Sequence, residues 1–549
     1  MTKTARLAAR CNRWTPAING VLVAFVLVVP TTVILLGGRI GEKQAVWIKT
    51  AVAGIRRDDA SILHPKTTGN GRLLGGLLVE GFDQKSCHSR YQSAVYRRNP
   101  GRKPSQYLVS KLRSQEALQR RCGPGTAAYT NALEQLKSGK SLASPECRYL
   151  VSISYRGLGN RIIAAASEFL YALLTDRVFL VDPNTSMDEL FCEPFLNTSW
   201  LVPPGFPLGY RAFYLSTPER YGKMREDGVL RTDQMNGSAA SGDLPAFAYI
   251  HLDYNQTDHD KLFFCDDDQR LLSNIQWLLI RSDSYIAPGL FLVEAFREEL
   301  DMLFPERDAV FHHLGRYLFH PTNDVWGLIT RYHDAHFAWA QRVVGIQVRV
   351  FPWRSESPEI LKQIKACTQN ERLLPAVLGE EEEEPVVKTT ASPSGAKPTA
   401  VLITSLKAWY HDKMKGMYWE RATANGEVVV FGQPSHEEIQ RYGVKSHEHK
   451  AWAEMYLLSM ADTLVTTGES TFGYVAHGLA GMRPWVLDMG MINSTVGWPC
   501  SRDMSMEPCF HIAPTKDCKR REDAGKIVPH VRHCKDRPTG LKLVGQKDW

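Results

Sequence analysis

A short polar loop follows the first buried strand that the sequence predicts. After the apolar residues 150–153 come Gly157, Gly159, Asn160 and Arg161, directly before a helical pattern. Two glycines allow close approach of the backbone, and the free N–H groups at a helix N-terminus bind anions such as phosphate. Asn160 and Arg161 would add an amide and a positive charge. A tight turn that packs the strand against the helix is the simpler interpretation of this loop, so the loop is a weak signal alone.

Arg349 is embedded in the run 343–350, which also reads as a buried strand. A buried charge without an anionic partner is costly, so this guanidinium needs either a carboxylate of the protein or a bound anion. Its planar fork matches the oxygens of a phosphate group. Arg349 is therefore the first candidate for binding a diphosphate, with a structural ion pair as the alternative.

A third polar loop follows the strand pattern at residues 463–466. It contains Ser470, Thr471 and Phe472 at the start of a predicted helix. This sequence fits a plain helix N-cap and a phosphate-binding turn equally well. The neighbouring Glu469 would repel a diphosphate unless its side chain points away.

Two other clusters could suggest a metal site. The acidic run 266–268 has the spacing of a metal-binding DxD motif, but such a run beside Cys265 more simply predicts a solvated loop. The histidines at 312, 313 and 320 could be zinc ligands only if they converge in space, and core or surface positions are the simpler prediction. We expect neither a metal nor another cofactor.

Alternating strands and helices must position these loops. Strand patterns at 150–153 and 177–182 flank a helical pattern over 162–174. After residue 340 the sequence predicts strands at 343–350, 400–403, 428–431 and 463–466, and helices at 357–366, 414–420, 451–460 and 471–479. Two such blocks predict an α/β fold with two doubly wound, Rossmann-like domains and a cleft between them, in which ligands bind at the carboxyl ends of strands.

The composition of the 549 residues is that of a folded protein, with 44% hydrophobic and 23% charged residues. Of the net charge of +7, four positive charges lie before residue 14, at Lys3, Arg6, Arg10 and Arg13. The remainder is nearly neutral and shows no basic face of the kind that binds nucleic acid. We therefore expect no nucleic-acid partner.

The segment after these four charges has no ionisable side chain from Trp14 to Gly38. It is long enough to span a bilayer, and a cleaved signal peptide is the alternative. The positive-inside rule then predicts a cytosolic tail (1–16), a transmembrane signal anchor (17–38) and a luminal remainder.

The cysteines are consistent with a luminal location. Ten of the eleven follow the anchor, and an even number suits disulfides in an oxidising compartment. Their pairing cannot be read from the sequence, but four of them between residues 500 and 534 predict a disulfide-rich tail. Glycosylation sequons begin at Asn184, Asn197, Asn236, Asn255 and Asn493.

Several motifs, in the same order along the chain, resemble the plant xyloglucan fucosyltransferase family. They are residues 157–161, 311–321, 345–351, 453–458, 470–476, 504–511 and 528–534. The resemblance runs from about Leu74 to Leu543, and so many long matches are far more specific than any single loop.

The resemblance implies a type II Golgi membrane enzyme with a GT-B-like fold. Such an enzyme transfers L-fucose from GDP-fucose to a cell-wall glycan with inversion and without a metal. By resemblance Arg349 binds the diphosphate, and Asp283 faces the acceptor sugar, where it orients or deprotonates the attacking hydroxyl. The donor pocket would be lined by Gly157, Gly159, Asn160, Arg161, Thr404, Ser405, Ser470, Thr471 and Phe472.

The expected domain order is a stem (39–80), an acceptor-side lobe (81–340), a GDP-fucose-side lobe (341–495) and the tail (496–549). The acidic run 380–398 reads as a solvated linker. Galactose of xyloglucan is the first expected acceptor, and arabinogalactan is the second. A transferase for another sugar nucleotide and a catalytically inactive wall-glycan binder are the alternatives, although intact Arg349 and Asn160 favour an enzyme. A homodimer and a complex with other wall glycosyltransferases both stay open.

Overall fold

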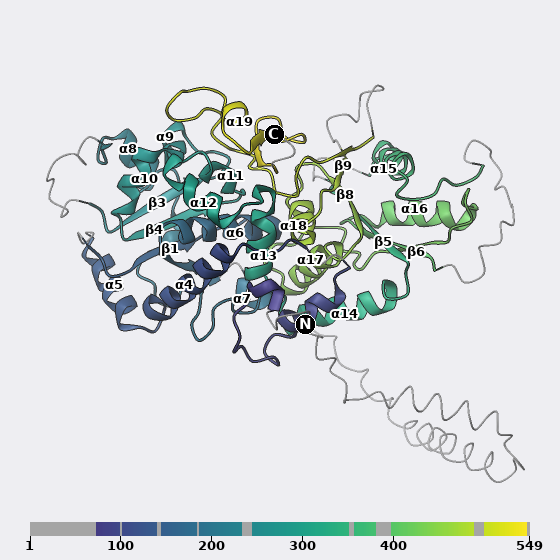
Figure 1. The fold of residues 1–549 in the computed structure, drawn as a ribbon, viewed down its shortest axis with the longest axis horizontal. Helices are drawn as coiled ribbons and strands as arrows, with labels where there is room; N and C mark the ends of the chain where they lie inside the picture. The colour runs from purple at the N-terminus through teal and green to yellow at the C-terminus, as the bar shows by residue number, and fades with distance from the viewer. Residues whose placement is uncertain are drawn as a thin grey trace, which may run out of the picture. The chain divides into compact units, whose positions relative to one another are not determined.

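A computed structural model of the chain describes residues 73–98, 101–139, 144–183, 186–232, 244–350, 356–379, 397–487 and 499–545. These residues contain two large β-sheets flanked by helices (Figure 1) and a small two-stranded sheet. The predicted cytosolic tail, the signal anchor, most of the stem and most of the acidic run lie outside the described residues. Within the described residues, no helix is both long enough and apolar enough to cross a membrane.

The first sheet has the strand order β2-β1-β4-β3, with all strands parallel. Its strands are β1 (Arg148–Ser152), β2 (Arg177–Val181), β3 (Phe247–Leu252) and β4 (Trp277–Ser282). Helix α6 (Leu158–Leu174) connects β1 to β2. Because β2 lies on one side of β1 and β4 on the other, the loops after β1 and β4 flank the point where the strand order reverses.

The second sheet has the order β10-β9-β8-β5-β6-β7. Its strands are β5 (Arg342–Gln347), β6 (Thr399–Thr404), β7 (Val429–Gly432), β8 (Thr463–Thr467), β9 (Trp485–Leu487) and the antiparallel β10 (Ser501–Arg502). The strand order reverses between β5 and β8. Strand β5 ends at Gln347, so Arg349 lies in the following loop and not within a strand as the sequence suggested.

The predicted α/β architecture with parallel sheets is confirmed. The helices of the second half are α15 (Pro358–Asn370), α16 (Ala408–Glu420), α17 (Lys445–Leu458) and α18 (Thr471–Ala480). The longer helices of the first half are α3 (His88–Tyr96), α4 (Gln106–Cys122), α5 (Ala127–Ser138), α10 (Asp266–Ser273), α13 (Val310–Leu318) and α14 (Asn323–His336). Shorter helices are α7 (Met187–Leu190), α8 (Tyr221–Glu226), α9 (Asp258–Lys261), α11 (Ala287–Leu290), α12 (Arg297–Leu303) and α19 (Ala524–Ile527).

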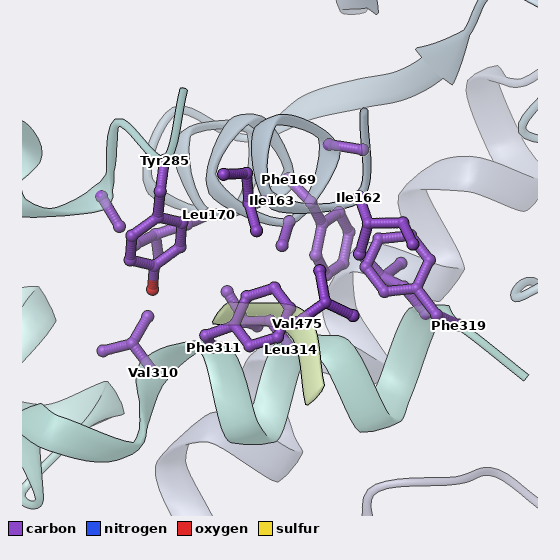
Figure 2. Close-up of a cluster of buried hydrophobic side chains, with 14 of the residues drawn as sticks. Ile162, Ile163, Phe169, Leu170, Tyr285, Val310, Phe311, Leu314, Phe319 and Val475 are labelled. Atoms are coloured by element: carbon purple, nitrogen blue, oxygen red, sulfur yellow. The ribbon is translucent and has the colours of Figure 1, made fainter. Parts of the chain in front are cut away.

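One hydrophobic core joins the helices of both sheets. Helices α6, α13, α17 and α18 pack against one another between the sheets (Figure 1). Ile162 and Phe169 of α6 lie beside Phe311 of α13 and Val475 of α18 (Figure 2). A Cβ on Gly478 would lie 2.4 Å from the Phe311 ring, so α13 and α18 are in close contact. Burial of each side chain of this size stabilises the fold by about 1.5–3 kcal/mol. The shared core therefore holds both sheets in one compact unit, Thr67–Trp549.

Five disulfides use all ten cysteines that follow the predicted anchor. They are Cys87–Cys192, Cys122–Cys147, Cys265–Cys518, Cys367–Cys500 and Cys509–Cys534. The C-terminal segment, which we define as residues 499–545, contains the two-stranded sheet β11 (Val531–His533) and β12 (Leu541–Leu543). Only one of its disulfides is internal, while the other two link it to the residue before α10 and to α15. The C-terminal segment is therefore fixed to both halves of the fold and is not cross-linked only to itself.

Candidate active site

A cavity of about 570 Å3 lies between the carboxyl ends of the two sheets. It is lined by the loops that follow β1, β3, β5, β6, β7 and β8, by the start of α6 and by residues of α17 between 447 and 455. The loops after β1, β5 and β8, which flank the points of reversed strand order, line it, and doubly wound folds bind ligands at such points. The predicted site residues that line it are Gly157, Gly159, Asn160, Arg349, Thr404, Ser405, Ser470, Thr471 and Phe472.

The N-termini of α6 and α18 meet at this cavity. A Cβ on Gly159 would lie 2.8 Å from the backbone of Thr471, so only glycine allows this approach. The Thr471 hydroxyl donates to Oδ1 of Asn160 at 3.0 Å, and Nδ2 of Asn160 donates to the carbonyl of Asp283 at 2.7 Å. The Asn160 amide therefore joins the two loops of the site. Two helix N-termini with positive partial charge face one space, an arrangement suited to an anion.

Ser470 acts as the N-cap of α18. Its hydroxyl accepts a hydrogen bond from the Gly473 N–H at 3.5 Å, and its side chain is buried. Of the two interpretations of this loop, a helix N-cap and a phosphate-binding turn, the structure shows the N-cap. The helix that it caps still presents its first residues, Thr471 and Phe472, to the cavity.

Arg349 lies two residues after β5 at the wall of the cavity. Its backbone N–H donates to the Thr467 hydroxyl at 2.9 Å, and its Nη2 donates to Oε1 of Gln440 at 3.2 Å. Burial lowers the pKa of Arg349 from its ordinary value, but the guanidinium stays charged near neutral pH. A positive charge therefore lines the same cavity as the two helix N-termini.

Polar groups after β6 complete this wall. Thr404 ends β6, and its buried hydroxyl has no hydrogen-bond partner among the described residues. The Ser405 hydroxyl accepts from the Lys407 N–H at 3.1 Å. Because buried polar groups are rarely left unpaired, the Thr404 hydroxyl is well placed to bond a ligand in the cavity.

Four carboxylates line the cavity, and each is compensated. Glu437 is bonded to Lys450 and His447, and Glu448 to Arg161. Glu454 accepts a hydrogen bond from Ser435, and burial raises the pKa of Glu454 to about 8, so it is mostly protonated near neutral pH. Glu469, which the sequence left as a possible source of repulsion, pairs with Arg537 at 2.8 Å. These acids therefore do not cancel the charge of Arg349.

Arg161 does not line the cavity, in contrast to its expected role as a charge for an anion. Its guanidinium is buried, and its Nη2 lies 2.5 Å from Oε1 of Glu448 on α17. The reason is geometric: Arg161 lies on the face of α6 that packs against α17. Its charge joins two helices and is not presented to a ligand.

Asp283 also lies behind the cavity wall and not in it. It is buried, and it accepts hydrogen bonds from the Ser154 hydroxyl at 2.6 Å and from Nε of Arg156 at 3.0 Å. Burial raises the pKa of Asp283 above its ordinary value. Arg156 lines the cavity and also contacts Asp253 at 3.4 Å. Asp283 thus reaches the site through Arg156, which the sequence analysis did not single out although it belongs to the same loop as Gly157.

The two candidate metal clusters have structural roles. Asp266 begins α10, so the expected solvated loop is wrong, and Asp268 is buried and bonded to Tyr221 and Arg225. Among the described residues, the cluster with metal-like spacing is Cys509, Cys534 and Asp536, and its two sulfurs form a disulfide.

The three histidines at 312, 313 and 320 are buried, as the simpler prediction stated. Burial lowers the pKa of His313 to about 3, and it lowers the pKa of His312 and His320 well below the ordinary value. All three are therefore neutral near neutral pH and belong to the core between α13 and its neighbours.

Comparison with known proteins decides the family. The family model described as xyloglucan fucosyltransferase matches residues 49–519. The chain belongs to this family. It is 50% identical over 481 residues to galactoside 2-alpha-L-fucosyltransferase of Pisum sativum, which covers 86% of this chain and 82% of the relative. It is 45% identical over 547 residues to fucosyltransferase 2 of Arabidopsis thaliana, which covers 96% of this chain and 99% of the relative.

A solved structure agrees with this assignment to the xyloglucan fucosyltransferases. A point variant of FUT1 from Arabidopsis thaliana, in complex with GDP, matches with a TM-score of 0.77 and 48% identity, covering 86% of this chain and 100% of that chain. The predicted family is confirmed, and so is the prediction of a glycosyltransferase that transfers fucose.

Proposed function

We propose that this fucosyltransferase binds GDP-fucose in the cavity between the two sheets and transfers L-fucose, with inversion, to a plant cell-wall glycan. One observation carries the proposal: Arg349 and the N-termini of α6 and α18 converge on a single cavity. This combination suits a diphosphate, whose negative charge grows as GDP leaves. The GDP complex of the similar FUT1 structure supports the same donor.

The two sheets would then act as the two lobes of a GT-B-like fold. The loops after β5, β6 and β8 and the start of α6 would hold the nucleotide diphosphate, with Arg349 binding its oxygens. Arg156, fixed by Asp283, stands on the wall that the first sheet contributes. In this arrangement Asp283 orients Arg156 and does not itself remove a proton, which replaces the role expected from the sequence.

For the acceptor, we propose galactose of xyloglucan, with attachment at its 2-hydroxyl. The support is the name galactoside 2-alpha-L-fucosyltransferase, carried by relatives from Pisum sativum and Arabidopsis thaliana at 50% and 49% identity. Arabinogalactan is the second candidate acceptor.

The test is GDP release by the full chain, purified in detergent. We would supply GDP-fucose with xyloglucan, with arabinogalactan or with buffer, and GDP-mannose as a second donor. Faster release with xyloglucan than with arabinogalactan, and little release from GDP-mannose, is the expected result. Release with neither glycan, together with no GDP binding in calorimetry, would contradict the transferase proposal.

We further propose that the protein is a single-pass type II protein of the Golgi membrane. The support is the basic N-terminus before residues 17–38 and the five disulfides, which suit an oxidising lumen. A tag at the C-terminus should resist protease in sealed Golgi vesicles and become sensitive once detergent is added. Digestion of the tag in sealed vesicles would exclude this topology.

A further inference from the structure

A chain of hydrogen bonds runs from the cavity into the C-terminal segment. Tyr254, which follows β3, lines the cavity, and its Oη lies 3.0 Å from Nδ1 of His511. On the other side of the imidazole, Nε2 lies 3.0 Å from Oη of Tyr474 in α18. Tyr474 in turn donates to Oδ2 of Asp536 at 2.6 Å. The chain thus joins the first sheet, the second sheet and the C-terminal segment beside one cavity.

The direction of each of these three hydrogen bonds can be worked out from Asp536, where the series ends. Burial alone would raise the pKa of Asp536, but the Lys542 ammonium and the Tyr474 hydroxyl hold it below the ordinary value. An ionised carboxylate only accepts, so Tyr474 donates to it and its oxygen must accept from Nε2–H of His511. Burial lowers the pKa of His511 to about 4, so the ring is neutral and Nδ1 is an acceptor. Tyr254 therefore donates a hydrogen bond to Nδ1 of His511.

Two further contacts hold Tyr254 and the loop after β3 in place. The Arg156 guanidinium lies 5.3 Å from the centre of the Tyr254 ring, and Asp283 holds that guanidinium. Nε2 of Gln256 donates to the carbonyl of Ile512 at 2.5 Å, so the loop after β3 is bonded to the C-terminal segment twice. Tyr254 as a residue is 43% exposed despite these contacts. An aromatic residue held by these contacts therefore lines the cavity.

This series of hydrogen bonds is poorly suited to removing a proton from the acceptor hydroxyl. A proton passed from a sugar hydroxyl along it would end on Asp536, whose carboxylate is stabilised by Lys542 and by the N–H of Glu469 at 3.0 Å. A carboxylate with a lowered pKa is a weak base. Orientation suits the geometry better, because the Tyr254 oxygen, which donates a hydrogen bond to His511 and lies beside Ser284, keeps a lone pair for a further hydroxyl donor.

We propose that Tyr254 binds the acceptor glycan, with its ring as a contact surface and its oxygen as a hydrogen-bond acceptor, and that His511, Tyr474 and Asp536 are positioning residues that hold it. This inference rests on the proposed function. It assigns the C-terminal segment a part in acceptor binding, on the part of the cavity wall that follows β3.

The test is the steady-state kinetics of the full chain carrying Tyr254→Phe, which keeps the ring and removes the hydroxyl. The expected result is an increase of about three- to tenfold in KM for the xyloglucan acceptor, the usual effect of one lost hydrogen bond. The KM for GDP-fucose and the Kd for GDP should stay unchanged. Tyr214→Phe is the matched control, because its hydroxyl accepts from Asn255 and it does not line the cavity.

A second variant tests whether the hydrogen bonds from Tyr254 to Asp536 act as one connected series. Tyr474→Phe should raise the acceptor KM in the same direction, and the double variant with Tyr254→Phe should be no worse than Tyr254→Phe alone, because both changes break one connected unit. Independent, additive effects, an unchanged acceptor KM, or an equal change in the KM for GDP-fucose would overturn the inference. If the unmodified protein transfers no fucose to any glycan, the proposed function fails first, and the two failures are distinguishable.

Discussion

Single side chains at the cavity wall decide what the site can bind. Arg349 brings a positive charge to a space whose acids are all compensated, by Arg537 for Glu469 and by a raised pKa for Glu454. The sequence identified Arg349 because a charge within a predicted buried strand needs an anionic partner, although the structure places it just after β5. It did not show that Arg161, in an equally suggestive loop, is paired with Glu448.

Arg349→Ala should lower the rate of fucose transfer at least about a hundredfold, because removal of one preorganised group that stabilises developing charge costs roughly 2.7–4 kcal/mol. The measurement is kcat with saturating GDP-fucose and xyloglucan. Arg121→Ala, which removes an exposed arginine on α4 outside the cavity, should leave kcat unchanged. Near-normal kcat in Arg349→Ala would remove this residue from the site.

At the scale of elements, the site depends on how closely α6 approaches α18. The positions of these helices along the chain follow from local periodicity, and the structure finds them within a few residues of the predicted bounds. Their contact does not follow from local periodicity, because Gly159 and Thr471 are more than 300 residues apart in the chain. A glycine in a loop is compatible with many turns, and only packing shows which neighbour requires it.

Gly159→Ala should separate the two helix N-termini, since its Cβ would lie 2.8 Å from the backbone of Thr471. Overpacking of this kind costs about 1–3 kcal/mol, so we expect a lower melting temperature and a weaker Kd for GDP. Calorimetry and thermal unfolding would measure both. Gly209→Ala is the matched control, because a Cβ there meets nothing within 4 Å. Unchanged GDP binding in Gly159→Ala would contradict the proposed role of this contact.

At the scale of the whole molecule, buried ionisable groups couple stability to pH. Burial raises the pKa of Glu454 and Glu507 to about 8, so the folded protein keeps protons that the unfolded chain releases near pH 4.5. Burial lowers the pKa of His313 and His477 to about 3, so the unfolded chain takes up protons below pH 6.5 that the folded protein does not. Between pH 4.5 and 6.5 the glutamates and the histidines change the stability in opposite directions as the pH rises. Above pH 6.5 only the glutamates change the stability, and below pH 4.5 only the histidines do.

The melting temperature should therefore fall as the pH rises from 6.5 to 8, and fall again as it drops below about 4.5. Each buried glutamate contributes a loss of about 2 kcal/mol over the upper range. Glu454→Gln, which is neutral at every pH, should weaken the fall between pH 6.5 and 8 in scanning calorimetry. Glu298→Gln, an exposed change on α12, should not. An identical slope in Glu454→Gln and the unmodified chain would contradict the burial argument.

The sequence by itself determined the alternation of strands and helices, the loops that carry the chemistry and the family, because each rests on short-range patterns or on ordered motifs. Tertiary structure alone decided which loop residues face the cavity, how the ten cysteines pair, and that Asp283 lies behind Arg156. It also brought Tyr254 to His511, 257 positions further along the chain. The physical reason is that charge, burial and contact between distant segments depend on packing, which no local pattern specifies.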